Sequence, residues 1–429
     1  MSECLAANMA VLAARWPALA EALEQAPADT LNAELVEGLG STLSVEGVQL
    51  SSRHDRLAEA NLQAASYPDA PCLHLYGPGL GDLPRALLQR PVQRLEVYLL
   101  NLALFRLVLE LLDQSDWLAD PRLHLAQAFE GGELRLPFFA PPPELVLADD
   151  ANAKVRDRLV SELHLAFNNQ PFHADAPEIV ERLAANAPFL AQDSSVAELF
   201  DSRPGVSACV LATGPTLEQH FEYLHKLLQQ PGRPLLISVD TAYRPLINRG
   251  IVPDIVVTLD QRINHRHLPA ENNEAVTLVY LPLLAPEMIQ SWRGPRYVAC
   301  STSPVYEQLR KRQPMAVLHS AGSVIHPAVD LAVRMGAAQV ALFGADFAFP
   351  GDRTHAGWLD GELGPTMSDA RHWVLDGHGQ RVRTQLNFRS YLCELERYIE
   401  RHPQVRFINT SRDGAAIAGC EILPEPFDA

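Results

Sequence analysis

Two neighbouring stretches decide the fold of this chain: 206-VSACVLATGPTLEQHFEYLHKLL-228 and 234-PLLISVDTAYRPLINRGIVPDIVVTLD-260. Short apolar runs at Ala208–Ala212, Leu235–Val239 and Ile255–Leu259 are typical of buried strands, and helical patterns lie between them. The order predicts a βαβαβ unit in which each strand delivers polar residues to its carboxyl end. In open α/β sheets, ligands bind at that edge.

A small turn follows the first of these strands. Gly214, Pro215 and Thr216 lead from the strand into a helix expected to begin near Leu217. A glycine lets a ligand approach the backbone closely, and free N–H groups at a helix start favour an anion. The turn is therefore a candidate phosphate site, although any strand-to-helix turn can carry these residue types.

Carboxylates follow the next two strands. Asp240 and Thr241 end the second strand, and Asp260 ends the third. If they face one crevice, these side chains could bind ribose hydroxyls, orient a substrate amine or hold a divalent cation. The alternative for each aspartate is a cap on the next helix or turn. Their joint placement favours a site.

Two further segments extend this edge. Ser320, Gly322 and Ser323 form a hydroxyl-rich turn that opens a helix running to Met335, which makes a second candidate anion site. The strand Gln339–Phe343 is followed by Asp346 and then by a loop that carries His355. A loop histidine at a carboxyl strand edge suits acid–base chemistry, although an isolated loop histidine is usually just solvated.

The remaining chain divides around this region. Residues 1–145 are expected to form a smaller N-terminal α/β domain, 146–204 a helical connector, and 205–429 the main domain. In the N-terminal part, the strand Cys72–Tyr76 leads into the glycine-rich turn Gly77–Asp82. Pro78 removes an N–H there and the spacing is not GxGxxG, so the turn is expected to close a βα unit without binding a dinucleotide.

Composition narrows the class of protein. The chain has 35 basic and 52 acidic residues, a net charge of -17, which argues against a nucleic-acid or anionic-membrane surface. Six cysteines stand singly and indicate reduced thiols, with no metal site firmly predicted. The longest apolar run, Val97–Leu112, is too short for a membrane span, and no basic leader precedes it. We expect a cytoplasmic protein.

Several motifs occur in an order that resembles a known family. They are ATGPTL (Ala212–Leu217), SVDTAYRPLINRGIVPDIVVTLD (Ser238–Asp260), SAGSVIHPAVDLAVRMG (Ser320–Gly336), FGADFAFPGDRTHAG (Phe343–Gly357) and INTSRDGAAIAG (Ile408–Gly419). Together they look like the motility accessory factor family, which shares a domain with archaeal 6-hydroxymethylpterin pyrophosphokinases. The resemblance covers about half of the chain.

This resemblance implies a Rossmann-like domain similar to a sialyltransferase fold. It also implies a glycosyltransferase that moves a nonulosonic acid of the pseudaminic or legionaminic type from a CMP donor to Ser or Thr of flagellin, in flagellar glycosylation and motility. No cofactor is obligatory in this interpretation. The implied roles are catalysis by His355 with Asp346, nucleotide and phosphate binding by the two small turns, and sugar binding by Asp240, Thr241, Asp260 and Arg412.

Two other functions remain open at the sequence level. An ATP- and Mg²⁺-dependent pyrophosphokinase would use Asp240 and Asp260 as metal ligands. No GxxxxGK[ST] motif is present, although the family does not rely on one. A non-catalytic flagellin-binding protein is the third hypothesis.

Overall fold

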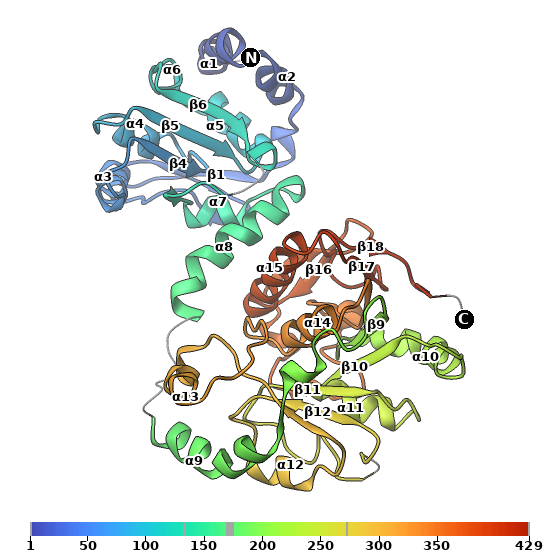
Figure 1. The fold of residues 1–429 in the computed structure, drawn as a ribbon. Helices are drawn as coiled ribbons and strands as arrows, with labels where there is room; N and C mark the ends of the chain where they lie inside the picture. Colours follow the sequence, from blue (N-terminus) through green and yellow to red (C-terminus); the bar gives the residue numbers. More distant parts are fainter. Residues whose placement is uncertain (1, 132–133, 169–175, 272, 428–429) are drawn as a thin grey trace. The chain divides into compact units, whose positions relative to one another are not determined.

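The computed structural model describes residues 2–131, 134–168, 176–271 and 273–427. The chain separates into two compact units, Met1–His164 and Leu165–Ala429 (Figure 1). Each unit has its own sheets and hydrophobic core, so each is described by itself.

The second unit is a mixed α/β fold built on one nine-stranded sheet, and every neighbouring pair of strands in it is parallel. Its strands are β8 (Ser194–Ser195), β9 (Ser207–Leu211), β10 (Leu235–Val239), β11 (Ile255–Thr258), β12 (Thr277–Tyr280), β13 (Arg296–Val298), β14 (Gln339–Phe343), β17 (Arg406–Asn409) and β18 (Glu421–Ile422). Its helices are α9 (Pro177–Gln192), α10 (Phe221–Leu228), α11 (Asp240–Ile247), α12 (Pro286–Ser291), α13 (Glu307–Arg312), α14 (Ile325–Arg334) and α15 (Leu386–Glu400).

The strand order places a topological switch beside β9. Across the sheet the order is β18-β17-β14-β9-β10-β11-β12-β13-β8. From β9 the chain builds outward through β10 to β13, and it later returns to add β14 on the other side of β9. The central strands are buried on both faces, as their continuous apolar sequences predict. A doubly wound sheet of this kind opens a crevice at the carboxyl ends of its switch strands.

Two element boundaries differ from the sequence expectation. Asp240 and Thr241, which were expected to end the second strand, form the first turn of α11. After β9, residues Pro215–His220 form a 3₁₀ helix, and the α-helix α10 begins only at Phe221. Pro215 at the first helical position is compatible with this tight turn because proline needs no N–H donor there.

The C-terminal part adds a hairpin and a long helix. The hairpin is made of β15 (His372–Leu375) and β16 (Arg381–Thr384), and α15 follows it. Leu392, Leu395 and Tyr398 of α15 are buried in the main core, as their helical spacing predicts. Phe388 and Tyr391 of the same stripe are only partly buried, which leaves them available to a cavity.

The first unit has two small sheets. One is four-stranded and parallel in the order β6-β5-β4-β7, and the other is antiparallel in the order β1-β2-β3. Its strands are β1 (Ala33–Val36), β2 (Thr42–Val45), β3 (Val48–Gln49), β4 (Cys72–Tyr76), β5 (Arg94–Leu99), β6 (Leu123–Gln127) and β7 (Phe138–Phe139). Its helices are α1 (Glu3–Arg15), α2 (Pro17–Gln25), α3 (Arg56–Ser66), α4 (Asp82–Leu88), α5 (Leu102–Leu111), α6 (Ser115–Leu118), α7 (Pro142–Val146) and α8 (Ala153–Asn168).

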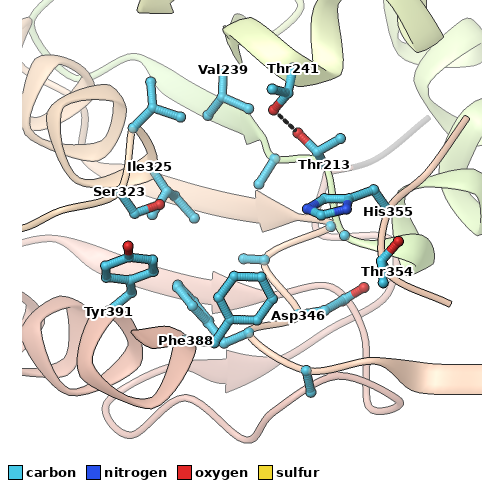
Figure 2. Close-up of a pocket in the computed structure, with 17 residues that line it drawn as sticks. Thr213, Val239, Thr241, Ser323, Ile325, Asp346, Thr354, His355, Phe388 and Tyr391 are labelled. Atoms are coloured by element: carbon cyan, nitrogen blue, oxygen red, sulfur yellow. Dashed lines mark hydrogen bonds between the residues drawn. The ribbon is translucent and has the colours of Figure 1, made fainter. Parts of the chain in front are cut away.

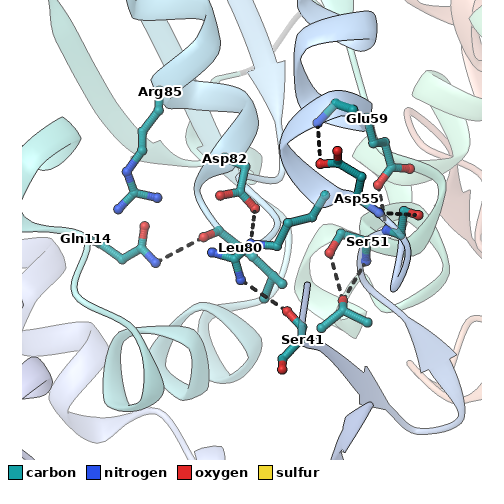
Figure 3. A network of polar contacts seen from close by, with 12 residues as sticks. Ser41, Ser51, Asp55, Glu59, Leu80, Asp82, Arg85 and Gln114 are labelled. Carbon is teal, nitrogen blue, oxygen red and sulfur yellow. Dashed lines mark hydrogen bonds and ion pairs between the residues drawn. The ribbon is translucent and has the colours of Figure 1, made fainter. Parts of the chain in front are cut away.

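The glycine-rich turn after β4 is held by protein groups. The N–H of Gly79 donates to Glu144 Oε1 at 2.7 Å, so a buried carboxylate lies where an anionic ligand would approach. Gln114 donates to the carbonyl of Leu80 at 3.1 Å in the polar network of Figure 3. A Cβ on Gly77 would come within 2.3 Å of the Glu144 side chain, which explains this glycine by close packing.

The segment expected as a connector is shared between the units. Helix α9 packs on the second unit, where Asn186 donates to the carbonyls of Pro282 and Leu284 at 2.8 and 2.7 Å. β8 then joins the edge of the nine-stranded sheet. The sequence also predicts a break between two helical patterns at Pro171, and this position lies outside the described residues. Among the described helices, none combines the length and apolar character needed to cross a bilayer.

Candidate functional site

A cavity of about 130 Å³ lies at the carboxyl ends of β9, β10 and β14, where the strand order switches (Figure 2). Its walls come from the segments after these strands, from the loop that follows β14, and from α14 and α15. The lining residues are Ala212, Thr213, Gly214, Val239, Thr241, Ser323, Val324, Ile325, Gly344, Ala345, Asp346, Phe347, Ala348, Thr354, His355, Phe388 and Tyr391.

The floor of the cavity depends on a close approach between two strand ends. The N–H of Gly214 donates to the carbonyl of Gly344 at 2.8 Å. A Cβ on Gly214 would lie 2.4 Å from Asp346 Oδ2 and 2.5 Å from that carbonyl oxygen. Gly344 has φ of +64°, and Phe347 has a positive φ of +46° that is costly for a bulky residue. The unfavourable backbone conformation of Phe347 is therefore part of the segment that forms this floor.

Asp346 is buried beneath this floor and is bound to the turn after β9. The backbone N–H of Thr216 donates to Asp346 Oδ2 at 2.9 Å, and the Thr216 hydroxyl donates to Oδ1. Burial raises the pKa of Asp346 to about 6, although both hydrogen bonds from Thr216 act to lower it. The carboxylate therefore holds the two strand ends together, and a protein group uses the N–H that was expected to bind phosphate.

The loop after β14 is fastened over the cavity by three sets of contacts. Ala356 N–H donates to the carbonyl of Thr213 at 2.8 Å, and the Trp358 indole donates to the carbonyl of Thr241 at 2.9 Å. Arg353 makes a two-pronged ion pair with Glu218, at 2.9 and 2.7 Å. These contacts tie the loop to the segments after β9 and β10 and fix its position at the strand edge.

His355 is the titratable group of this loop that faces the cavity (Figure 2). Its Nδ1 is buried without a hydrogen-bond partner, and so is the hydroxyl of its neighbour Thr354. Burial lowers the pKa of His355 to about 4, opposed by the charge of Asp360. The imidazole is therefore neutral at neutral pH and has an unused nitrogen, which is the state required of a proton acceptor.

The opposite wall comes from α14 and α15. Ser323 precedes α14, while Phe388 and Tyr391 project from α15 (Figure 2). His326 joins the two helices, because its Nδ1 and Nε2 each lie 3.0 Å from a carbonyl oxygen, of Ser323 and Tyr391 respectively. This buried ring positions a hydroxyl group and an aromatic face on the same side of the cavity.

The two aspartates after β10 and β11 lie outside the cavity lining, and both are engaged. Asp240 is buried, accepts from the Thr258 hydroxyl at 2.8 Å and from the Thr241 N–H at 2.7 Å, and has a pKa raised by burial to about 7. Burial also acts to raise the pKa of Asp260, but its hydrogen bonds and ion pair with Arg262 prevail and lower it. Asp240 thus links the first turn of α11 to β11, and Asp260 accepts from the backbone of the turn that follows it.

The structure brings five of the twelve candidate residues to the cavity: Gly214, Thr241, Ser323, Asp346 and His355. The other seven do not line it: Pro215, Thr216, Ser320, Gly322, Asp240, Asp260 and Arg412. Of these, Gly322 serves packing, because a Cβ there would lie 2.7 Å from the Tyr391 ring, and Arg412 is exposed on the C-terminal loop. The carboxylate of Asp346, which the resemblance pairs with His355 in catalysis, is bound to Thr216.

The lining residues that sequence reasoning missed include Thr213, Thr354, Phe388 and Tyr391. The Thr213 and Thr241 hydroxyls are hydrogen-bonded to each other across the ends of β9 and β10. The position of Thr213 directly after the first strand was an available signal. The two aromatic residues gave none, because a helical apolar stripe normally predicts core packing.

Mg²⁺ is the cofactor that the pyrophosphokinase alternative requires. Such an ion is usually held by one or two carboxylates together with substrate phosphates. Asp240 and Asp260 are the carboxylates assigned to it, and both are already bound by Thr258, Thr241 and Arg262. Their present contacts do not fit a prepared Mg²⁺ site. Among the described residues, the one group with three potential metal ligands lies in the first unit.

Fold and cavity together define a doubly wound α/β domain with a ligand crevice at its switch point. Residues 181–352 match the family model described as 6-hydroxymethylpterin diphosphokinase MptE-like, so an MptE-like domain is present over less than half of the chain.

One solved structure and the curated proteins complete the comparison. The chain is similar to the MAf glycosyltransferase from Magnetospirillum magneticum AMB-1, with 18% identity, a TM-score of 0.46, and coverage of 99% of this chain and 74% of that one. At this identity and TM-score, the likeness does not transfer that enzyme's function to this chain. No curated protein matches.

Proposed function

We propose that the second unit is a glycosyltransferase that moves a nonulosonic acid from a CMP donor to a Ser or Thr hydroxyl of flagellin. The observation that carries this proposal is the position of His355. Its imidazole ring lines a cavity at the switch point of a doubly wound sheet, opposite Ser323 and Tyr391, and no protein group occupies its buried Nδ1. A neutral base facing a row of hydroxyl donors suits attack by an alcohol.

The proposed reaction is a single displacement at the anomeric carbon of the sugar. The acceptor hydroxyl oxygen forms a bond to this carbon as the bond from carbon to the phosphate oxygen breaks. The electron pair of the broken bond leaves with CMP, and the hydroxyl proton passes to the ring nitrogen of His355 that the acceptor reaches in the cavity. A displacement of this kind inverts the configuration of the anomeric carbon.

The leaving phosphate needs donors around it. Thr213, Thr241 and Ser323 supply hydroxyl groups to the cavity. Those of Thr213 and Thr241 lie side by side and are hydrogen-bonded to each other, and that of Ser323 lies across the cavity from them. Hydroxyls and backbone N–H groups that are fixed before the reaction stabilise developing negative charge without reorganising. The N–H of Gly214 is bound to the Gly344 carbonyl and its missing Cβ serves packing against Asp346, so we assign the phosphate to the hydroxyl groups.

The low pKa of His355 in the free protein has a consequence for this mechanism. A base works best when its pKa lies near the operating pH, and a pKa of about 4 is below that range. A CMP-linked nonulosonic acid carries a phosphate and a carboxylate, and a nearby negative charge raises the pKa of an imidazole. Donor binding would therefore make His355 a stronger base than it is in the free protein.

The size of the cavity limits which part of the donor it encloses. Pockets for whole small molecules usually measure roughly 300–1,000 Å³, whereas this cavity measures about 130 Å³. We assign the enclosed volume to the reacting centre, namely the phosphate and the anomeric carbon. The nucleoside and the glycerol-like tail of the sugar would extend along the open strand edge toward Asp260.

A pyrophosphokinase activity is the second candidate, because the matched family model carries that description. It would require ATP, Mg²⁺ and a pterin-like acceptor. The engaged contacts of Asp240 and Asp260 weigh against it. A purely flagellin-binding role is the third candidate, and it predicts no turnover with any donor.

A transfer assay separates the three functions. Purified protein is mixed with unglycosylated flagellin and CMP-activated pseudaminic, legionaminic or sialic acid in the presence of EDTA, and the mass of flagellin is followed. The proposal predicts a stepwise gain of one sugar mass per modified residue, with equimolar release of CMP. Transfer of pyrophosphate from ATP only in the presence of Mg²⁺, or no turnover together with tight flagellin binding, would replace it with the second or third candidate.

A further inference from the structure

The first unit contains a side-chain cluster that plays no part in the proposed transfer. Cys72 and His74 lie two residues apart on β4, so their side chains emerge on the same face of the four-stranded sheet. Glu96 on β5 is the registered partner of His74, and the two strands are parallel. The three residues therefore form one patch across two neighbouring strands.

The separations within this patch are those of potential metal ligands. The two contacts of the His74 ring use opposite nitrogens, because Nε2 lies 3.8 Å from Cys72 Sγ and Nδ1 lies 3.0 Å from Glu96 Oε2. An ion bound to one of these nitrogens therefore requires the ligand on the other side of the ring to move toward it. One ligand atom from each residue lies within 4.8 Å of the other two. Bond lengths to zinc of about 2.0–2.3 Å at tetrahedral angles require ligand atoms about 3.3–3.6 Å apart. Side-chain adjustments of about 1 Å would therefore bring the three donors around one ion.

The ring of His74 is short of partners in its present state. It is buried, and its Nδ1 lies 3.0 Å from Glu96 Oε2 without the alignment of a good hydrogen bond. A poorly satisfied buried polar atom carries a cost in free energy. A metal ion bound by this cluster would remove that cost.

Glu96 is held by two neighbours, of which the exposed one would have to release it to an ion. Its Oε2 accepts from the Tyr98 hydroxyl at 2.5 Å, and Arg94 holds Oε1 at 2.8 Å. Ligating carboxylates are commonly oriented by such outer hydrogen bonds. The side chain of Arg94 is 53% exposed and can move into solvent as an ion enters.

We propose that Cys72, His74 and Glu96 form a zinc-type divalent metal site on the sheet of the first unit. Thiolate, imidazole and carboxylate are the three ligand types that zinc accepts, and three protein ligands leave a fourth position open. Cys72 is only partly buried, so solvent or another small ligand has access to that position. The site is separate from the cavity of the second unit and needs no property of the proposed transfer.

A nucleophilic Cys–His–Glu triad is the competing interpretation of the same three residues. In such triads the cysteine thiol is activated by a depressed pKa. Here burial and the charge of Glu96 raise the pKa of Cys72, and the weaker effects of Arg94 and Arg135 do not reverse this. The thiol is therefore not activated in the absence of a metal.

Titration of the untagged, metal-free full-length protein with Co²⁺ tests the site. Thiolate-to-Co²⁺ charge transfer gives a near-ultraviolet band that other ligands do not produce. We expect this band to saturate at one equivalent of Co²⁺ and to be displaced by one equivalent of Zn²⁺. Cys72→Ser is expected to abolish the band, whereas the matched control Cys4→Ser, another partly buried cysteine of the first unit, keeps it.

Two further variants distinguish ligands from neighbouring residues. His74→Gln is expected to abolish stoichiometric binding, while Tyr98→Phe, which removes only the outer hydrogen bond to Glu96, should weaken Co²⁺ binding by about 10–100-fold. Circular dichroism of each variant checks that the fold is retained. No band at one equivalent in the wild-type protein, or an unchanged band in folded Cys72→Ser, would overturn the proposal.

Discussion

Replacing His355 by glutamine tests the proposed base directly. Glutamine is uncharged and similar in size to the neutral imidazole that the structure predicts at neutral pH, but its amide does not accept a proton. General bases contribute about 10²–10⁴-fold to rate, which corresponds to about 3–5 kcal/mol of barrier. We therefore expect His355→Gln to lower kcat by about that factor, while the Kd for CMP stays nearly unchanged.

The pH profile carries independent information about the same residue. The pKa of His355 in the free protein is about 4, and the deprotonated ring is the active form. The value of kcat/KM should therefore fall as the pH drops through about 4 and stay level above it. The inflection in kcat should lie at higher pH, because the bound donor is anionic. Both inflections should disappear from the residual activity of His355→Gln.

Release of CMP during sugar transfer provides the assay, and His225→Gln provides the matched control. His225 is an exposed residue of α10 that does not line the cavity, so its replacement should leave kcat unchanged. Wild-type turnover in His355→Gln, or an unchanged pH profile in that variant, would remove His355 from the mechanism.

Three further predictions concern stability. Gly214→Ala places a Cβ at 2.4 Å from Asp346 Oδ2 and 2.5 Å from the Gly344 carbonyl. We expect the free energy of unfolding, measured with urea, to fall by about 1–3 kcal/mol. An unchanged free energy of unfolding would mean that this packing is relaxed in solution. The pKa of Asp346 is raised to about 6, so the folded state holds its proton more tightly and wild-type stability falls as pH rises from 4 to 6. Asp346→Asn lacks this dependence, and its stability relative to wild type should rise by up to about 3 kcal/mol between pH 4 and 7; a constant difference would contradict the raised pKa. The pKa of Glu144 is raised by burial to about 7, so the free energy of unfolding of Glu144→Gln should rise relative to that of wild type from pH 5 to 8. A constant difference between the two proteins over this pH range would contradict the raised pKa.

The main sheet was predictable because its strands are short, fully apolar and separated by helical patterns. β10 and β14 lie at the residues expected, and β9 and β11 differ by one residue at their ends. The carboxyl edge as the location of a cavity followed from parallel topology alone. Gly214, Thr241 and His355 were found in this way, as residues placed just beyond strand ends.

Side-chain direction was not predictable from the same pattern. Asp240 and Thr241 are adjacent in sequence, but only Thr241 faces the cavity. Both lie in the first turn of α11, and successive residues of a helix point about 100° apart around its axis. Asp346 turned out to bind Thr216, since the close approach of the two strand ends buries the carboxylate next to that N–H group. Contacts between segments about 130 residues apart, such as this one, leave no local signature in the sequence.

The helix α15 shows a second limit of prediction from sequence. Its apolar stripe is continuous in sequence, yet Leu392, Leu395 and Tyr398 enter the core while Phe388 and Tyr391 line the cavity. The division depends on where the helix passes the sheet edge. Periodicity defines the buried face of a helix but does not show which turns of it meet a ligand.

Isothermal titration calorimetry with CMP is the measurement that tests the central claim most directly. CMP, CMP-sialic acid and ATP are titrated into wild-type protein and into Ser323→Leu, whose larger side chain would fill the cavity. Each titration is run once with EDTA and once with Mg²⁺. We predict that CMP and CMP-sialic acid bind wild-type protein at one equivalent in EDTA, and that folded Ser323→Leu binds neither. Binding of ATP with Mg²⁺ in the absence of any CMP binding, or equal CMP binding to Ser323→Leu, would contradict the account.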